Sequence, residues 1–240
     1  MTDPAVEPSL ADFFAAMRPF LLGETSVTAL EASLGHSPTG SDGLAFYATF
    51  LRRHERLLLQ RQFKAAYHLI DRFSDLDWPS LVHDFIRAHP PSSWSMYRTG
   101  EPFSAWLLAQ IEAGVQVPAA APYLVDFAWT RWLARNAPRD APLMEGQVFV
   151  RQYPVDVVVL NRSLCDTEDP PQDAPGPKTL VIFRHLQSGD VFHFTPSLAT
   201  LAVLDSASGT PSVDWPAQGV TPAMQQSERD QLVQRGVLQG

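Results

Sequence analysis

Cysteine is almost absent from this chain of 240 residues, which contains only Cys165. A single thiol excludes an intramolecular disulfide framework and any zinc site built from several cysteines. The segment that follows it is acidic and rich in proline, and no basic residue is adjacent to activate the thiol as a nucleophile. We therefore interpret Cys165 as an incidental or packed thiol.

An excess of positive charge is also missing, because 18 Lys and Arg residues face 26 Asp and Glu residues and the net charge is −8. A chain with this charge has no general attraction to nucleic acid or to anionic lipid. No apolar run is long enough to span a bilayer, and the first residues are acidic where a signal peptide is basic. A cytoplasmic location is the expectation.

Catalytic motifs are missing as well. No Gly-x-Ser-x-Gly elbow occurs, and Gly40–Gly43 lacks the lysine and the preceding strand of a phosphate-binding loop. Glu168 and Asp169 are adjacent carboxylates, but they lie in a proline-rich segment that fixes no geometry. We expect neither an active site nor a cofactor in this chain.

What is present is the composition of a globular protein with a core, since 45% of the residues are hydrophobic and 18% are charged. The chain is longer than the ~100–150 residues of one common domain, so we expect two domains. The first, residues 1–140, predicts an all-helical bundle, because apolar residues recur at helical spacing between capping residues and prolines. The predicted helices are Ser9–Gly23, Leu44–Phe73, Ser80–Ala88, Pro102–Ala113 and Pro122–Asn136, with a loop at 35–43.

The second domain, residues 141–240, predicts a three-stranded antiparallel sheet followed by two or three short helices. Together with the bundle this indicates an α+β fold whose second domain is small and winged-helix-like. Residues 155–160 are rich in β-branched side chains and too few for a helix, so they are interpreted as the first strand. A proline-rich linker follows at 166–178. The remaining predicted elements are strands at 179–186 and 191–195 and helices at 196–204 and 227–235.

Histidine is the residue type that most often carries chemistry, and the chain has seven. Five are scattered without the spacing of metal ligands, whereas His185 and His193 lie in one predicted hairpin. If Ser188-Gly189 forms a two-residue turn, Arg184 pairs with His193, and the two imidazoles point to opposite faces of the sheet. They then share no metal ion, and we expect no metal site.

A basic stretch between Leu51 and Arg72 contains six basic and two acidic residues. One interpretation is a helix face that meets an acidic partner or a nucleic-acid backbone. The other is a solvated face with extended arginines. Both stay open.

The edge of the small predicted sheet is a candidate binding site. Residues 191–194 are short, apolar and followed at once by a helix, so we expect a groove between the strand and the helices. An edge strand exposes unpaired backbone groups, to which a peptide adds as a further strand. The alternative is that a loop or the bundle covers this edge.

Two sequence blocks carry a family resemblance. Phe85–Trp94 (FIRAHPPSSW) and Pro122–Trp132 (PYLVDFAWTRW), in this order and spacing, resemble the HvfC/BufC-type proteins. Those are partners of multinuclear non-haem iron enzymes that modify peptides, as in methanobactin and thiaglutamate biosynthesis. The resemblance covers roughly residues 44–160, with departures at Arg131, where an acid is usual, and at Phe73–Trp78. It implies a non-catalytic partner subunit, with the iron held by the enzyme.

The C-terminal part is similar to the recognition element that binds leader peptides of ribosomally synthesised and post-translationally modified peptides. Residues 188–196 and 230–238 carry this similarity, which implies that the leader lies between the third strand and the last helix. The implied peptide-binding residues are Val191, Phe192, His193, Phe194, Gln231, Leu232 and Arg235.

Taken together, the two resemblances imply a subunit that binds the leader of a precursor peptide while the helical bundle docks on the iron enzyme. Aromatic anchors and one arginine are candidates for that docking, with core packing as the other role of the aromatic residues. These candidates are Trp94, Tyr97, Arg98, Phe103 and Trp106. The alternative function is a winged-helix-type DNA-binding transcriptional regulator, against which the net charge of −8 counts.

Overall fold

The computed structural model describes residues 10–35, 40–90, 96–138, 147–166, 176–209 and 213–239. Helices and one three-stranded antiparallel sheet give an α+β fold, as predicted. The helices are α1 (Leu10–Leu21), α2 (Val27–Leu34), α3 (Gly40–Gln62), α4 (Lys64–Phe73), α5 (Trp78–Ala88), α6 (Phe103–Glu112), α7 (Ala121–Asn136), α8 (Val157–Asp166), α9 (Leu198–Ala207) and α10 (Pro222–Gln234). The strands in the described ranges are β1 (Val148–Tyr153), β2 (Lys178–Arg184) and β3 (Val191–Phe194), and the 3-10 helices there are η1 (Met96–Gly100) and η3 (Pro216–Gln218).

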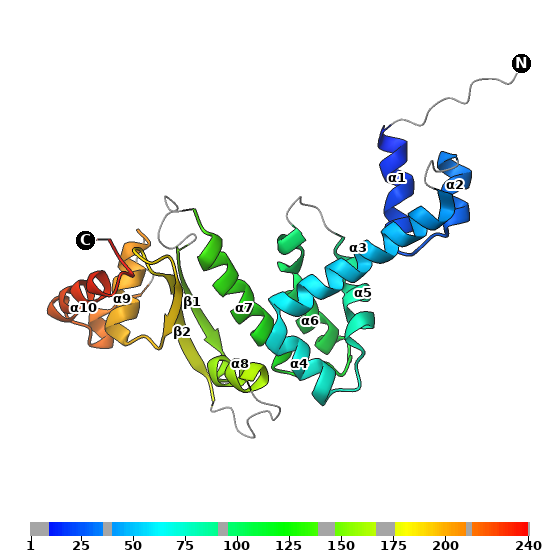
Figure 1. Ribbon diagram of the computed structural model, residues 1–240. Coiled ribbons are helices and arrows are strands. Elements are labelled where there is room, and N and C mark those ends of the chain that lie inside the picture. The colour runs from blue at the N-terminus through cyan, green and yellow to red at the C-terminus, as the bar shows by residue number, and fades with distance from the viewer. Residues whose placement is uncertain are drawn as a thin grey trace, which may run out of the picture.

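The molecule is elongated, with an N-terminal arm at one end and the α9–α10 pair at the other (Figure 1). The arm consists of α1, α2 and the first half of α3, which pack on a small cluster around Phe20, Leu30 and Ala48. Helix α2 was not predicted. It begins where the hydroxyl of Ser26 accepts from the amide of Ala29, and it is only eight residues long.

Two predicted boundaries in the helical half are wrong. The loop expected at 35–43 ends early, because α3 begins at Gly40; residues 36–39 lie outside the described part. The single helix expected over Leu44–Phe73 is two helices that meet at Phe63, whose φ of −114° and ψ of 42° leave the helical region. This turn buries the Phe63 ring completely against Phe103, a gain that outweighs helical continuity.

The bundle core is built on aromatic rings around Phe103. Its ring centroid lies 4.6 Å from that of Phe85, 5.6 Å from Phe63, 5.8 Å from Trp78 and 6.0 Å from Trp106. These contacts join the junction of α3 and α4 to α5 and α6, and all five side chains are buried. The helical half is therefore a packed aromatic cluster rather than a loose set of amphipathic helices.

The predicted first strand, 155–160, is wrong, because Val157–Asp166 form α8. Asp156 begins this helix: its carboxylate accepts from the amides of Val158 and Val159, at 3.1 Å and 3.2 Å. The buried side chains Val157, Leu160 and Leu164 recur at helical spacing and join the bundle core. Capping and a buried helical face thus override the strand propensity of the valines. The first strand is instead β1, which begins at Val148, seven residues before the predicted start at residue 155.

Asp156 also pairs with the ammonium group of Lys178, and burial alone would raise the pKa of its carboxyl. Hydrogen bonds from Lys178, Val159 and Val158 outweigh burial and hold that pKa below its ordinary value. We expect Asp156→Ala to lower the free energy of unfolding by about 2 kcal/mol, measured by urea unfolding at neutral pH. Asp166→Asn, at the exposed end of α8, is the control and should cost little.

The pH dependence follows from the lowered pKa. A carboxyl that is more acidic in the folded state stabilises it above the unfolded pKa of about 4 and stops doing so as the pH falls through the folded value. The difference in stability between the native chain and Asp156→Ala should therefore shrink in acid below about pH 4. An undiminished difference in that range would contradict this role of the carboxylate.

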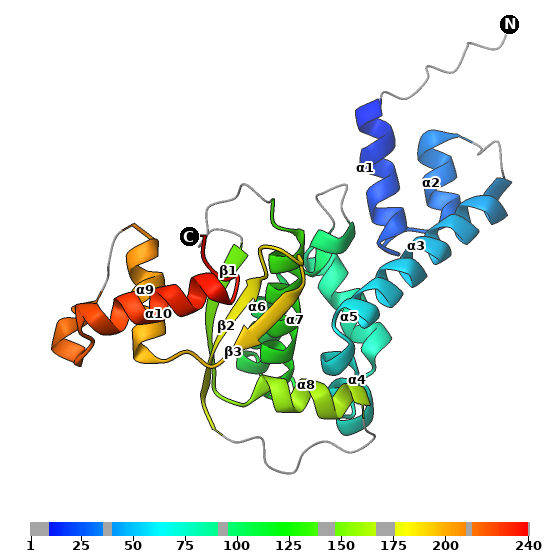
Figure 2. The same ribbon diagram turned by 60° about the vertical axis from the view of Figure 1, so that its left-hand side comes forward.

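The sheet has the strand order β1-β2-β3 and lies between two layers of helices (Figures 1 and 2). Leu180 and Ile182 of β2 point to α7 and share the bundle core, whereas Val181 and Phe183 point to α9 and α10. Helix α8 packs on α4. The boundary predicted near 140 falls at residues 139–146, which lie outside the described part, and the two predicted domains share one continuous core.

Candidate functional site

The strand β3 lies at one edge of the sheet and pairs only with β2 among the described residues. The hairpin register differs from the predicted one by two residues: Arg184 pairs with Val191, and Ile182 pairs with His193. The turn is longer than predicted and is closed by the His185 amide, which donates to the Asp190 carbonyl at 2.8 Å. Because a shift of two residues preserves the alternation of side chains, the predicted faces are unchanged.

The two hairpin histidines lie on opposite faces of the sheet, as predicted. The His193 ring faces α7, where its centroid is 5.6 Å from that of Phe127 and its Nδ1 is 3.4 Å from Nη1 of Arg131. His185 faces the end of α10 and lies beside Phe192. In the described ranges, no group of three or more His, Cys, Asp or Glu residues is arranged to hold a metal ion.

The main-chain groups of β3 divide between its two sides. Hydrogen-bonded and non-hydrogen-bonded pairs alternate along an antiparallel ladder, and the bond between His185 and Asp190 sets the phase. The amides and carbonyls of Phe192 and Phe194 consequently point to β2. Those of Val191 and His193 point outward, to the edge that no other described strand pairs with. These two residues present the donors and acceptors that an additional strand needs.

The side chains of β3 differ in exposure. Phe192 is 49% exposed and packs beside Phe183, with ring centroids 6.0 Å apart, on the face of the sheet that carries α10. His193 and Phe194 are half-buried, and Val191 is buried. The edge therefore offers one large exposed aromatic side chain beside its outward main-chain groups.

Helix α10 contributes less to this site than predicted. Gln231 and Arg235 are exposed on its surface, and Arg235 donates to Oε1 of Gln231 at 3.4 Å. Leu232 is completely buried against Val181 and Phe183, so it is a core residue and no ligand reaches it. The predicted groove between strand and helix is thus filled by core side chains at Leu232, and the free feature is the strand edge.

The end of α10 is fixed to the hairpin at Gly236. The Leu186 amide donates to the Gly236 carbonyl at 3.0 Å, and Gly236 has a φ of +67°. A Cβ at this position would lie 2.6 Å from Nε2 of His185. The close approach and the left-handed backbone both require glycine here.

We expect Gly236→Ala to destabilise the folded chain by about 2 kcal/mol, because it adds the contact with His185 to the strain of a positive φ. Gly114→Ala is the matched control, since Gly114 has a φ of +88° and open space around it. It should cost about 1 kcal/mol. Urea unfolding of both variants measures the difference, and equal losses would show that the contact with His185 contributes nothing.

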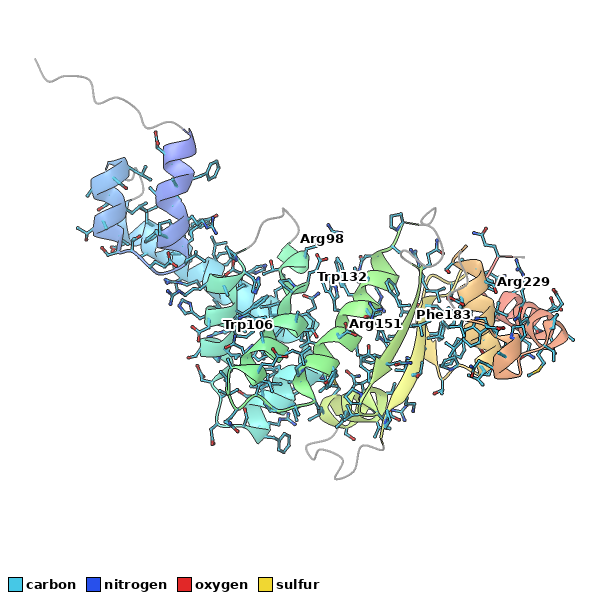
Figure 3. The ribbon with its side chains drawn as sticks, turned by 180° about the vertical axis from the view of Figure 1, so that it is seen from behind. Arg98, Trp106, Trp132, Arg151, Phe183 and Arg229 are labelled. Atoms are coloured by element: carbon cyan, nitrogen blue, oxygen red, sulfur yellow. The ribbon has the colours of Figure 1, made fainter. Side chains whose placement is uncertain are left out.

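The predicted docking residues lie in different surroundings. Trp94 lies outside the described residues, as does the side chain of Tyr97, whose backbone belongs to η1. Arg98 is exposed at the end of the bundle (Figure 3). Phe103 and Trp106 are buried in the aromatic core, so the prediction that they anchor a partner is wrong for these two.

Polar contacts between α7 and the sheet were not predicted. Asp126 accepts from the hydroxyl of Tyr153 at 2.8 Å and pairs with Arg151, which lies between β1 and α7 (Figure 3). Burial raises the pKa of Tyr153 strongly, and the carboxylate of Asp126 raises it further. On this face Arg131 stands beside His193. Burial lowers the pKa of His193, and Arg131, Lys178 and Arg162 lower it further, against Asp156.

The thiol of Cys165 shows no activation. Burial raises its pKa, which is the dominant effect, and Lys64 only partly opposes this. A raised pKa keeps the thiol protonated at neutral pH. Cys165 is partly buried and packs against the bundle core, which fits the interpretation of a packed thiol.

Two further surface features lie on the helical half. A pocket of about 250 Å³ lies between α1, α3 and α5. Three arginines of the predicted basic stretch and one arginine of α5 line it: Arg52, Arg53, Arg56 and Arg87. Exposed aromatic rings gather on the first half of α3, where Phe46 and Phe50 stack with centroids 6.4 Å apart. Neither feature adjoins the β3 edge, since α1 and the first half of α3 lie away from the sheet (Figure 2).

None of the described helices combines the length and the apolar character that crossing a membrane requires. Comparison of the chain with family models, with curated proteins and with solved structures finds no match.

Proposed function

We propose that this chain is a non-catalytic binding subunit in the biosynthesis of a ribosomally synthesised, modified peptide. In this role it binds the leader of the precursor and presents the peptide to an iron-dependent modifying enzyme. The observation that carries the proposal is the outward orientation of the Val191 and His193 main-chain groups at an edge unpaired within the described chain. The resemblance of the sequence to partner proteins of such enzymes supplies the reaction context.

The peptide would add to β3 as a fourth strand. Its main-chain groups would bond to those of Val191 and His193, and its side chains would alternate between the α7 face and the α10 face. Each such hydrogen bond contributes about 1 kcal/mol, and ordering the peptide opposes them. Exposed Phe192 adds apolar contact on the α10 face. An affinity in the micromolar range is the expected result.

The helical half would contact the enzyme. Phe46, Tyr47 and Phe50 expose large aromatic surfaces on the N-terminal arm, and Arg98 is exposed on the bundle. Contiguous exposed apolar surface of this kind is characteristic of protein interfaces. Holding leader and enzyme on different parts of one chain raises the local concentration of the substrate beside the active site. Iron and oxidation chemistry belong to the enzyme in this proposal.

The test is co-expression of the chain with the iron enzyme and the precursor peptide, followed by purification through a tag on the chain. We expect a complex of all three components, and modification of the peptide only when enzyme and chain are both present. Modification by the chain alone, or full activity and peptide binding by the enzyme alone, would contradict the proposal.

Regulation by DNA binding is not proposed. Helix α10 would be the recognition helix of a winged-helix unit, but Glu228, Arg229 and Asp230 leave it without a basic face. A DNA-binding helix needs such a face to neutralise phosphates.

A further inference from the structure

Basic side chains follow the α7 side of the β3 edge. Arg131 lies beside His193, and Arg135 lies one turn further along α7. At the hairpin end, Nη1 of Arg184 donates to the carbonyl of Ala137 at 2.8 Å, which places the end of α7 beside the start of β3. Arg162 and Lys178 act electrostatically on His193 from the same face of the sheet. The cationic groups thus extend along the strand rather than gathering at one point.

Arg131 is a partly buried cation without an acidic partner among the described residues. Its guanidinium lies 5.6 Å from the ring centroid of Phe127 and 3.4 Å from Nδ1 of His193. Burial lowers the pKa of Arg131, and the charge of Arg135 lowers it further. The charged guanidinium is therefore less stable at this position than it is in water. A carboxylate next to the guanidinium would stabilise its charged form.

Among the described residues, the two carboxylates on this face, Asp126 and Asp156, are already engaged. Asp156 pairs with Lys178 and caps α8, and Asp126 accepts from Tyr153 and pairs with Arg151. Neither carboxylate forms an ion pair with Arg131. Counted over the described residues, the α7 side of the edge is therefore electropositive, although the whole chain has a net charge of −8.

Resting on the function proposed above, we infer that the peptide added to β3 carries carboxylate side chains at alternate positions, which face α7 and contact Arg131 and Arg135. The alternation follows from strand geometry, because successive side chains of the added strand point to opposite faces. Only every second side chain faces the arginines, and the others face Phe192 on the α10 side. The edge selects an acidic pattern, not merely an acidic peptide.

The test uses synthetic peptides with the full chain. In one peptide glutamate alternates with threonine; in the second, glutamine replaces every glutamate; in the third, the same glutamates and threonines are segregated into two blocks. We expect the alternating acidic peptide to bind roughly tenfold more tightly than the other two at low salt, with the advantage shrinking as salt is added.

Variants of the arginines complete the test. Arg131→Gln and Arg135→Gln should each remove most of the preference for the alternating acidic peptide. Arg18→Gln, an equal charge change at an exposed position on α1, should leave it unchanged. Because Arg135 is exposed, its replacement tests the preference without disturbing the core.

The outcomes separate this specificity from the proposed function. Equal affinities for all three peptides, with protection of the Val191 and His193 amides from hydrogen exchange, would overturn the acidic preference and leave strand addition intact. Failure of every peptide, including the natural precursor, to protect those amides would overturn both. A preference that survives Arg131→Gln and Arg135→Gln would overturn the assignment to these arginines.

Discussion

Replacing Phe103 by alanine is expected to lower the free energy of unfolding by about 4 kcal/mol. The ring is completely buried and lies within 6.0 Å, centroid to centroid, of four other aromatic rings. Its removal loses the free energy of burying the ring and leaves a cavity between Phe63, α5 and α6 that these rigid neighbours cannot fill. Urea unfolding followed by circular dichroism measures the loss.

Phe46→Ala is the control for this prediction. Phe46 is 73% exposed on α3, so its replacement should change stability by no more than about 0.5 kcal/mol. Comparing Phe103→Ala with Phe46→Ala also distinguishes the two roles of Phe103, core packing and docking on a partner. A small loss for Phe103→Ala together with weakened enzyme binding would restore it as a docking residue and contradict the aromatic core described here.

His193→Pro is expected to weaken peptide binding about a hundredfold while the chain stays folded. Proline removes the outward amide of His193 and places its ring where the added strand would lie. It breaks no bond to β2, because proline is tolerated on an edge strand when its nitrogen faces away from the sheet. Titration of the precursor leader, followed by fluorescence anisotropy, measures the change.

Two matched variants separate main chain from side chain in this prediction. His193→Ala removes the imidazole and keeps the amide, so it should retain most of the affinity. Phe192→Pro removes an amide that points to β2, so it should destabilise the sheet itself rather than act on the peptide alone. Equal affinities of His193→Pro and His193→Ala would show that the outward amide of residue 193 takes no part.

The sequence predicted elements whose signal is local. The helices α5 and α7 lie close to their predicted positions, because a stripe of apolar residues and flanking prolines bound them. The opposite faces of His185 and His193 were also predicted correctly, although the register was not. Side-chain alternation has a period of two, so an error of two residues left the faces as they were.

What the sequence could not predict depends on distant partners. The valines of α8 have the composition of a strand, and only capping by Asp156, its pairing with Lys178 and packing on α4 make the segment helical. The break at Phe63 likewise depends on Phe103, forty residues away in sequence. Local propensity decides such segments only where tertiary packing does not.

The candidate site was predicted in part. The strand itself was found from its short apolar run, but the buried Leu232 was included as a ligand contact, because periodicity does not distinguish the two sides of a packed helix. In the sequence, Arg131 is notable only as a departure from a family pattern. Its position beside His193 requires the packing of α7 on β3, which no local pattern encodes.

Hydrogen exchange of individual β3 amides, followed by NMR with and without the precursor leader, tests strand addition most directly. The amides of Phe192 and Phe194 already donate to β2 and should be protected in both states. Those of Val191 and His193 point outward and should become protected only when the leader is bound. Saturating leader that leaves exchange at Val191 and His193 unchanged would contradict peptide binding at this edge.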